Sequence, residues 1–145
     1  MYDILDVSKY AINYSIQIDK PISNLKLQKV LYYIQAKFLI EKNEPCFEAE
    51  IENWRHGPVI PRVYRNFKKY FNSDIKIKQE NTSNFKENDR QLIESIIISY
   101  KDVDAWDMVN KTHKEDPWLS TERNEIISKE SIKNYFEVNK NRIMG

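Results

Sequence analysis

Apolar residues recur at spacings of three and four along most of the chain, the pattern of helices that bury one face. A first helix is predicted over residues 3–18. Its apolar face consists of Ile4, Val7, Ala11 and Tyr14. The Asp-Lys-Pro sequence at residues 19–21 breaks this helix. Ser23 or Asn24 can cap a second helix, which runs to about Lys42.

This second helix carries apolar residues on two faces. One stripe consists of Leu27, Val30, Leu31, Ile34 and Phe38, and the other of Leu25, Tyr32, Ala36 and Leu39. A helix that is apolar on two faces normally has neighbours packed on both sides, so we expect it at the centre of the fold. Gln28 and Lys29 therefore lie close to packed surfaces, where a buried glutamine needs hydrogen-bond partners.

The middle of the chain alternates short elements with turns. Residues 43–50 are predicted to form a loop, and residues 51–54 a short extended segment. Gly57-Pro58 predicts a turn. Pro61 suits the first turn of a helix over residues 61–71, because its missing N–H is not needed there.

Residues 72–88 are the least core-like stretch. Ile75 and Ile77 alternate with lysines, which indicates a short, half-exposed strand. Residues 79–88 are polar and are predicted to form a mobile loop. Helical spacing resumes over residues 89–100.

A further short helix is predicted after this one. Asp104 can cap a helix that runs to about Thr112, with Trp106 and Val109 facing inward. Pro117 is expected to end regular structure just before Trp118.

The last helix is predicted to begin near Ser128. Ile127 and Ile132 flank its start in the positions of a hydrophobic staple. The chain has only two glycines, which argues against a turn-rich β fold. We therefore expect a mainly α-helical fold: a compact, single-domain helical bundle around the central buried helix, with at most one small β element.

Composition narrows the classes of function. The 145 residues carry a net charge of +1, so no overall attraction to nucleic acid or membrane is expected. No apolar run is long enough to span a bilayer. The single cysteine, Cys46, excludes an intrachain disulfide and suits a reducing cytoplasm, where we expect the protein to act.

Three motifs in order give the chain a family resemblance. Residues 25–33 read Leu-Lys-Leu-Gln-Lys-Val-Leu-Tyr-Tyr, and Trp54 leads to Gly-Pro-Val-Ile-Pro-Arg-Val-Tyr at residues 57–64. Thr112-His113 is then followed by Pro-Trp at residues 117–118. Together these segments resemble the Panacea domain of SocA-like antitoxins and phage-associated proteins. The likeness spans roughly residues 3–118, with mild departures at Val30 and before Pro117.

The resemblance implies a single Panacea-like domain over residues 1–145 and a role without catalysis. Family members look like antitoxins that neutralise a toxin protein encoded beside them. At least one kind is an adaptor that delivers its toxin to a protease, and others are associated with phages or prophages. The resemblance names neither the toxin nor the oligomeric state.

The motif positions are the candidates for contact with a partner, and the polar segment 79–88 is the alternative. They are Gln28, Lys29, Tyr32, Trp54, Gly57, Pro58, Arg62, Tyr64, Thr112, His113 and Trp118. Each group also has a packing interpretation: a buried hydrogen-bond network for Gln28 and Tyr32, and a helix-end histidine bonded to backbone for His113. We favour packing for those two groups. For residues 54–64, two interpretations stay open: a tight turn with Trp54 and Tyr64 in the core, or an interface platform.

The sequence gives little support for catalysis or metal binding. There is no nucleophile elbow, phosphate-binding glycine-rich loop or zinc-protease motif. Cys46, His56 and His113 have no ligand partner at a metal-site spacing. We therefore expect no enzyme activity, metal or cofactor.

Nucleic-acid binding is the rival from another class. No acidic residue occurs between Asn53 and Ser73, and a helix there would place basic side chains on one face, where they could contact phosphates. The candidates are Arg55, Arg62, Arg65 and Lys69. A convincing recognition-helix motif is lacking, and an ordinary solvated face is the simpler interpretation.

Overall fold

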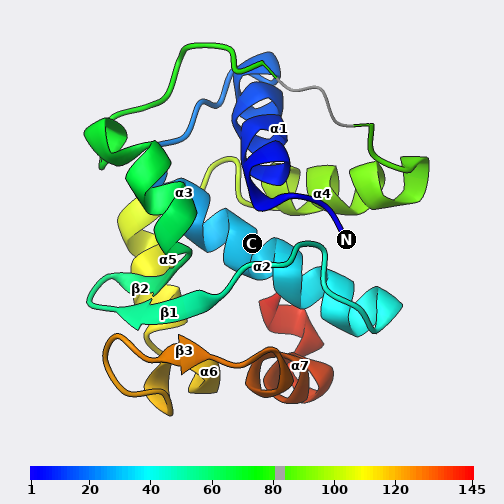
Figure 1. Cartoon of the computed structure of the whole chain (residues 1–145), viewed down its shortest axis with the longest axis vertical. Coiled ribbons are helices and arrows are strands. Elements are labelled where there is room, and N and C mark those ends of the chain that lie inside the picture. The colour runs from blue at the N-terminus through cyan, green and yellow to red at the C-terminus, as the bar shows by residue number, and fades with distance from the viewer. Residues whose placement is uncertain (81–83) are drawn as a thin grey trace.

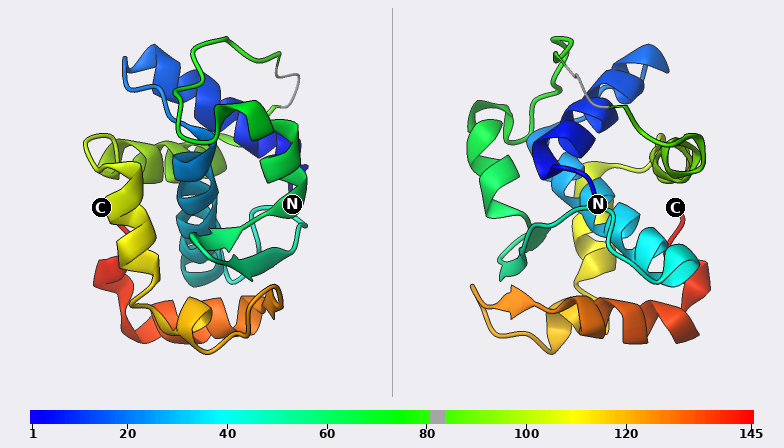
Figure 2. Two further views of the ribbon diagram at one scale, coloured as in Figure 1. Left: turned by 90° about the vertical axis from the view of Figure 1, so that its left-hand side faces the viewer. Right: turned by 45° about the vertical axis from the view of Figure 1, so that its right-hand side comes forward.

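Helix α2 (Asn24–Lys42) runs through the middle of the protein, and the other elements pack around it (Figures 1 and 2). The structure is a computed structural model that describes residues 1–80 and 84–145. Its other long helices are α1 (Ile4–Gln17), α4 (Glu87–Ser99), α5 (Ala105–Thr112) and α7 (Lys129–Val138). The mainly helical bundle around a central helix is therefore confirmed. Among the described residues, no helix has the length and apolar character needed to cross a membrane.

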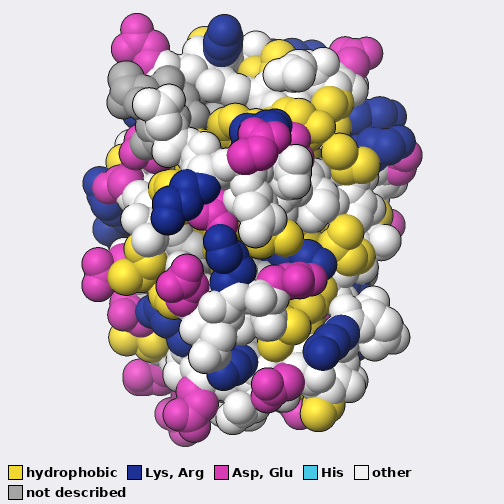
Figure 3. Space-filling view, turned by 90° about the vertical axis from the view of Figure 1, so that its right-hand side faces the viewer, with side chains coloured by type: hydrophobic (Ala, Val, Ile, Leu, Met, Phe, Trp, Pro, Cys, Tyr) yellow, Lys and Arg dark blue, Asp and Glu magenta, His cyan; other side chains and the backbone are white. Residues whose placement is uncertain are grey.

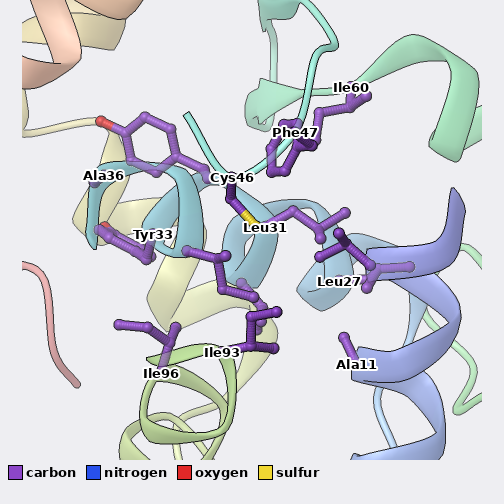
Figure 4. Close-up of a cluster of buried hydrophobic side chains, with 14 of the residues drawn as sticks. Ala11, Leu27, Leu31, Tyr33, Ala36, Cys46, Phe47, Ile60, Ile93 and Ile96 are labelled. Atoms are coloured by element: carbon purple, nitrogen blue, oxygen red, sulfur yellow. The ribbon is translucent and has the colours of Figure 1, made fainter. Parts of the chain in front are cut away.

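The core surrounds α2 on both sides, as its two apolar stripes predict: Tyr32 of one stripe packs on Phe136 of α7, and the other stripe faces α1 and α4. Leu27 and Leu31 of α2 meet Ala11 of α1 and Ile93 of α4, and all four side chains are fully buried (Figure 4). Burying a leucine or isoleucine side chain stabilises a fold by about 1.5–3 kcal/mol. The loop after α2 closes the same cluster with Cys46 and other side chains.

Side-chain caps fix where the main helices begin. Asp3 accepts a hydrogen bond from the N–H of Leu5 at 2.8 Å, and Ser23 accepts one from Lys26 at 3.2 Å. Asp104 caps α5 and Ser128 caps α7 in the same way. These caps confirm the predicted starts of α1, α2, α5 and α7, because each satisfies N–H groups that have no partner within the helix.

A small antiparallel sheet covers one end of the bundle. Its strands are β1 (Ile51–Trp54), β2 (Gly57–Val59) and β3 (Ile126–Ile127), in the order β2-β1-β3. Trp54 pairs with Gly57, so the hairpin turns at residues 55–56. The predicted turn at Gly57-Pro58 is therefore wrong by two residues. Pro58 is tolerated in a strand because β2 is an edge strand and leaves one side of its backbone unpaired.

The segment after the hairpin is less regular than predicted. Helix α3 (Pro61–Asn66) stops at Phe67, whose φ of −118° is not helical, and a 3-10 turn, η1 (Lys68–Tyr70), follows. No strand forms around Ile75. Its side chain is buried and its N–H donates to the Ile22 carbonyl at 2.8 Å. Burial of this single side chain accounts for the apolar pattern that predicted a strand.

Two further predictions need correction. Trp106 lies on the outside of α5 and is 41% exposed, whereas Val109 faces inward as expected. Pro117 does not end regular structure, because it lies in the first turn of the short helix α6 (Asp116–Leu119), where proline fits.

The predicted loop at 79–88 gives way to α4 at Glu87, and its residues 81–83 lie outside the described part of the chain. A 3-10 turn, η2 (Lys140–Arg142), follows α7.

Candidate functional site

The β1–β2 hairpin is held against α2 by two polar side chains of the first motif. Gln28 accepts a hydrogen bond from the Ile60 N–H at 2.8 Å and donates one to Asn24 at 2.8 Å. Lys29 donates to the Pro58 carbonyl oxygen at 3.3 Å. Both side chains are buried, so the first two motifs form one packed unit. For Gln28, this is the buried network that the packing interpretation expects.

Gly57 sits where the hairpin crosses α2 and α5. Its φ of +109° is a conformation that residues with a side chain rarely adopt. A Cβ atom at this position would lie 2.7 Å from both the Cε of Lys29 and the Oγ1 of Thr112. The glycine is therefore required twice, for the backbone angle and for the close approach to the two neighbours.

The third motif also packs against the hairpin. His113 ends α5, and its Nε2 lies 3.0 Å from the Arg55 carbonyl oxygen. Trp118 donates its indole N–H to the Trp54 carbonyl at 2.9 Å and stacks on His113 with ring centroids 4.1 Å apart. Burial lowers the pKa of His113 below its usual range. This histidine therefore makes the helix-end backbone contact that the packing interpretation expects.

An apolar pocket opens beside the hairpin, between α2 and the segment after α3. Its apolar wall consists of Leu25, Trp54, Val59, Tyr64 and Phe71, and its volume is about 90 Å³. Trp54 and Tyr64 meet edge to face with centroids 5.0 Å apart. Both rings are half-buried. They pack against each other, as the core interpretation expects, and they also line a recess, as an interface platform would.

Lys29 is the unusual residue of this pocket wall. Its side chain is 0% exposed, and the Pro58 carbonyl is its only hydrogen-bond partner within the described residues. Burial without a carboxylate partner lowers the pKa of Lys29 to about 7. The surrounding titratable or charged groups are Arg55, His56 and His113, which share its sign when protonated.

We expect this buried lysine to make stability depend on pH. An unfolded lysine keeps its ordinary pKa of 10.5, so between pH 7 and 10.5 the unfolded state binds more protons. The free energy of unfolding should therefore rise with pH above about 7, by up to ~1.4 kcal/mol per pH unit from this group. Below pH 7 both states are protonated, and the folded state carries the full cost of burial.

Urea unfolding of the wild type and of Lys29→Met at several pH values tests this. The variant should be more stable near neutral pH, and its stability should rise less steeply with pH. Lys111 contributes a slope of the same sign, since burial lowers its pKa to about 8, so the comparison uses the difference between the two proteins. Parallel curves would mean that Lys29 keeps an ordinary pKa.

A second buried charged group was not predicted. Glu115, at 0% exposure, accepts hydrogen bonds from the Tyr33 hydroxyl at 3.0 and 3.1 Å and from Nε of Arg142 at 3.2 Å. Burial raises the pKa of Glu115, while Lys111, Tyr33 and Arg142 act against that rise. The sequence signal is weak, because Glu115 stands in a charged Lys-Glu-Asp run that reads as solvated.

Aromatic rings complete this group, which we term the Glu115 cluster (Tyr33, Tyr100, Lys111, Glu115 and Arg142). Tyr33 and Tyr100 stack with centroids 5.0 Å apart, and the Lys111 ammonium lies 4.3 Å from the Tyr33 ring centroid. Lys111 also donates to the Tyr100 hydroxyl at 2.6 Å. The cluster ties α2 and α5 to the segment after α7, and lies apart from the pocket.

Tyr32 occupies the packed interior next to this cluster. Its ring is fully buried against Tyr33 and Phe136, with centroid separations of 5.0 and 5.9 Å. Among the described residues its hydroxyl has no hydrogen-bond partner, so the predicted network includes Gln28 but not Tyr32. Burial, with a smaller effect from Glu115, raises the pKa of Tyr32.

The basic residues proposed for nucleic acid are not brought together as one patch. Arg62 and Arg65 line a shallow depression that they share with Glu48, Glu50 and Glu52. Arg62 also lies 3.6 Å from Asp3. Arg55 instead lines the apolar pocket, and the Lys69 ammonium lies over the Tyr70 ring. Figure 3 shows the side that carries α4, where basic and acidic side chains are likewise interspersed.

The remaining candidates for chemistry are the cysteine and groups of possible metal ligands. Cys46 is buried, and burial raises the pKa of its thiol. Within residues 1–80 and 84–145, no group of three or more histidine, cysteine or acidic residues is placed to hold a metal ion.

Comparison with known proteins agrees with the motifs. The family model described as "Antitoxin SocA-like, Panacea domain" matches residues 27–119. Antitoxin SocA of Caulobacter vibrioides (strain NA1000 / CB15N) is 42% identical over 65 residues, which is 45% of this chain and 35% of that protein. The match thus spans about a third of the length of that relative, and no solved structure matches. With 27–119 covering more than half of its residues, the chain belongs to the SocA-like antitoxin family with a Panacea domain.

Proposed function

We propose that this protein is an antitoxin without enzyme activity, which binds a partner toxin protein in the cytoplasm and neutralises it. Membership of the SocA-like family is the observation that carries the proposal. The fold adds support, because the three motifs meet around the hairpin and leave an apolar pocket lined by aromatic rings. Trp106, exposed on α5, stands 5.0 Å from the His56 ring at the edge of this region.

The surface chemistry around the hairpin suits a protein partner. Tryptophan, tyrosine and arginine are the side chains that most often anchor protein interfaces. Trp54 and Tyr64 line the pocket, and Arg55 projects from the hairpin turn beside them. Neutralisation then follows either from covering the active surface of the toxin or from presenting the bound toxin to a protease.

A pull-down from the native host tests the proposal. The tagged protein is captured from a nuclease-treated lysate, and its partners are identified by mass spectrometry. We expect one stoichiometric protein that stops growth when expressed alone and does not when it is expressed with this chain. If each captured protein is harmless when expressed alone, the antitoxin proposal fails.

The fate of the toxin separates the two routes. After synthesis is blocked, the half-life of the toxin is followed with and without this protein. If this protein only covers the active surface of the toxin, the half-life of the toxin should be unchanged or longer, because a bound partner is protected from degradation. Delivery predicts a shorter half-life that returns to normal in a host lacking the protease.

The basic residues after the hairpin are not expected to take part. The triple variant Arg62→Glu, Arg65→Glu, Lys69→Glu should fold, since exposed ion pairs such as Arg62–Asp3 contribute less than about 1 kcal/mol. We expect rescue of growth and recovery of the partner within about twofold of the wild type. Rescue is measured by colony counts, and folding by circular dichroism.

The opposite result would revive the nucleic-acid alternative in a testable form. A folded triple variant that no longer rescues growth would place the functional contact on this face. Binding to DNA would then fall steeply with salt concentration, whereas a largely apolar protein contact would not.

A further inference from the structure

The pocket beside the hairpin combines an apolar wall with positive charge. Aromatic side chains from β1, α3 and the segment after η1 form the wall. The basic side chains that line it are Lys29, Arg55 and His56, and none of its described lining residues is an aspartate or glutamate. With a volume of about 90 Å³, the pocket has room for a single side chain.

Lys29 lacks the partner that a buried ammonium normally has. Buried charges are as a rule paired with an opposite charge. Here the single hydrogen bond within the described residues is a 3.3 Å contact to a carbonyl, although an ammonium has three N–H donors. The hairpin covers the lysine from one side, and the pocket adjoins it on another. A carboxylate in the pocket would supply the missing charge to an ammonium that turned from the Pro58 carbonyl toward the recess.

We propose that this pocket binds the C-terminal residue of a partner polypeptide, with an apolar side chain against Trp54 and Tyr64 and the α-carboxylate paired with Lys29. The inference rests on the proposed function, because it names the part of the toxin that this protein contacts. The pocket and a C-terminal residue are complementary in two ways. The three basic groups of the pocket suit the single negative charge of the carboxylate, and its apolar wall suits one apolar side chain.

A chain end fits better than an acidic side chain within a polypeptide. Aspartate and glutamate bring a carboxylate but no apolar group to fill an aromatic recess. A C-terminal leucine or phenylalanine carries both groups on one residue, within a few ångströms. Capture of a C-terminal carboxylate is a recognised mode of peptide binding.

Two small probes isolate the contribution of the carboxylate. N-acetyl-L-phenylalanine mimics a C-terminal residue, and N-acetyl-L-phenylalaninamide mimics the same residue within a chain. Binding of both to the purified full chain is followed by calorimetry and by NMR chemical shifts near pH 6.5. We expect the acid to bind about tenfold more tightly than the amide, since a hydrogen bond to a charged group contributes about 1.5 kcal/mol or more. Equal affinities would overturn the proposal.

Lysine variants locate the preference. In Lys29→Met the acid and the amide should bind equally, because the side chain keeps its length and loses its charge. Lys37→Met is the matched control: Lys37 lies on the same helix and pairs with Glu41 at 2.8 Å, away from the pocket. It should keep the tenfold preference. A preference that survives in Lys29→Met would place the bound carboxylate elsewhere and overturn the proposal.

Proton uptake gives a test that needs no variant. A carboxylate beside Lys29 stabilises the protonated form, so binding of the acid near pH 8 should take up about half a proton or more. His56 and His113 are already neutral there, because burial lowers the pKa of each below its usual range. Binding heats in two buffers of different ionisation enthalpy measure the uptake. Acid binding with no uptake would exclude Lys29 as the partner.

These results stand apart from the antitoxin proposal. The probes are tested on the protein alone, so failure of the pocket would leave growth rescue and partner capture to be judged on their own. If a toxin is captured normally but the pocket binds the acid and amide probes equally, the toxin is bound through another surface. Absence of any toxin, with the acid preference intact, would leave the pocket in need of a different partner.

Discussion

Replacing Glu115 with alanine is expected to lower the free energy of unfolding by about 3–5 kcal/mol. The substitution leaves the charges of Lys111 and Arg142 in partly buried surroundings and removes the acceptor of the Tyr33 hydroxyl. It also leaves a cavity beside α2. Removal of one partner from a buried ionic group costs more than the group contributes as a whole, because the remaining charges lose their compensation.

Glu115→Gln separates charge from shape in this experiment. Glutamine removes the charge but keeps the volume and can still accept from Tyr33, so we expect a smaller loss of about 1–2 kcal/mol, which is the part due to charge. Urea unfolding monitored by circular dichroism measures both variants at neutral pH. A loss below about 1 kcal/mol in the alanine variant would mean that the Glu115 cluster contributes little to the fold.

Gly57→Ala should have the next largest effect, a loss of about 2–4 kcal/mol. Part of the loss is backbone strain, because an alanine at a φ of +109° is unfavourable. The rest is overpacking, typically 1–3 kcal/mol, since the new Cβ would lie 2.7 Å from side-chain atoms of Lys29 and Thr112. The hairpin must shift away from α2 to relieve the clash, which also deforms the pocket.

Asn66→Ala is a suitable control for this variant. Asn66 is exposed at the end of α3, so the same new residue there should change stability by less than about 0.5 kcal/mol. Chemical unfolding measures stability, and the NMR signals of the Trp54 indole report the position of the hairpin. If Gly57→Ala is as stable as the control and leaves those signals in place, the close contact with Lys29 is not needed.

The long elements of this fold follow from local sequence signals. Helix α2 has apolar stripes on two faces and a serine cap, and both signals are strong enough to place it and its central position. Helices α1, α5 and α7 likewise start at a capping side chain. In these places the local preference of the chain and the packing of the whole molecule agree, so a single sequence is sufficient.

The short elements depend on contacts that a local pattern does not contain. Ile75 is buried, and its N–H bonds to the Ile22 carbonyl and not to a neighbouring strand, so the alternation with lysines did not indicate a strand. Strand β3 has two residues and exists because it pairs with Ile51 and Glu52, far away in the sequence. Trp106 is apolar but stands outside, next to His56 and Phe71 of other segments.

The candidate site shows the same division. Gln28, Gly57 and His113 were singled out by motif, and the structure gives each a definite contact. The convergence of the three motifs on one hairpin was not predicted, because spacing along the chain says nothing about which segments meet. Glu115 was missed for a related reason: a charged residue in a charged run is normally solvated, and only the tertiary fold buries it.

The placement of α1 and α7 has a consequence for how such proteins diversify. Both helices lie outside residues 27–119, the segment by which the family is recognised, yet they cover α2. Phe136 of α7, for example, packs on Tyr32 and Tyr33. Recombination that transfers only residues 27–119 would move most of α2 without the helices α1 and α7 that bury it. Exchanges that yield a folded protein must carry compatible flanking helices, so those flanks are expected to be inherited together with the motifs.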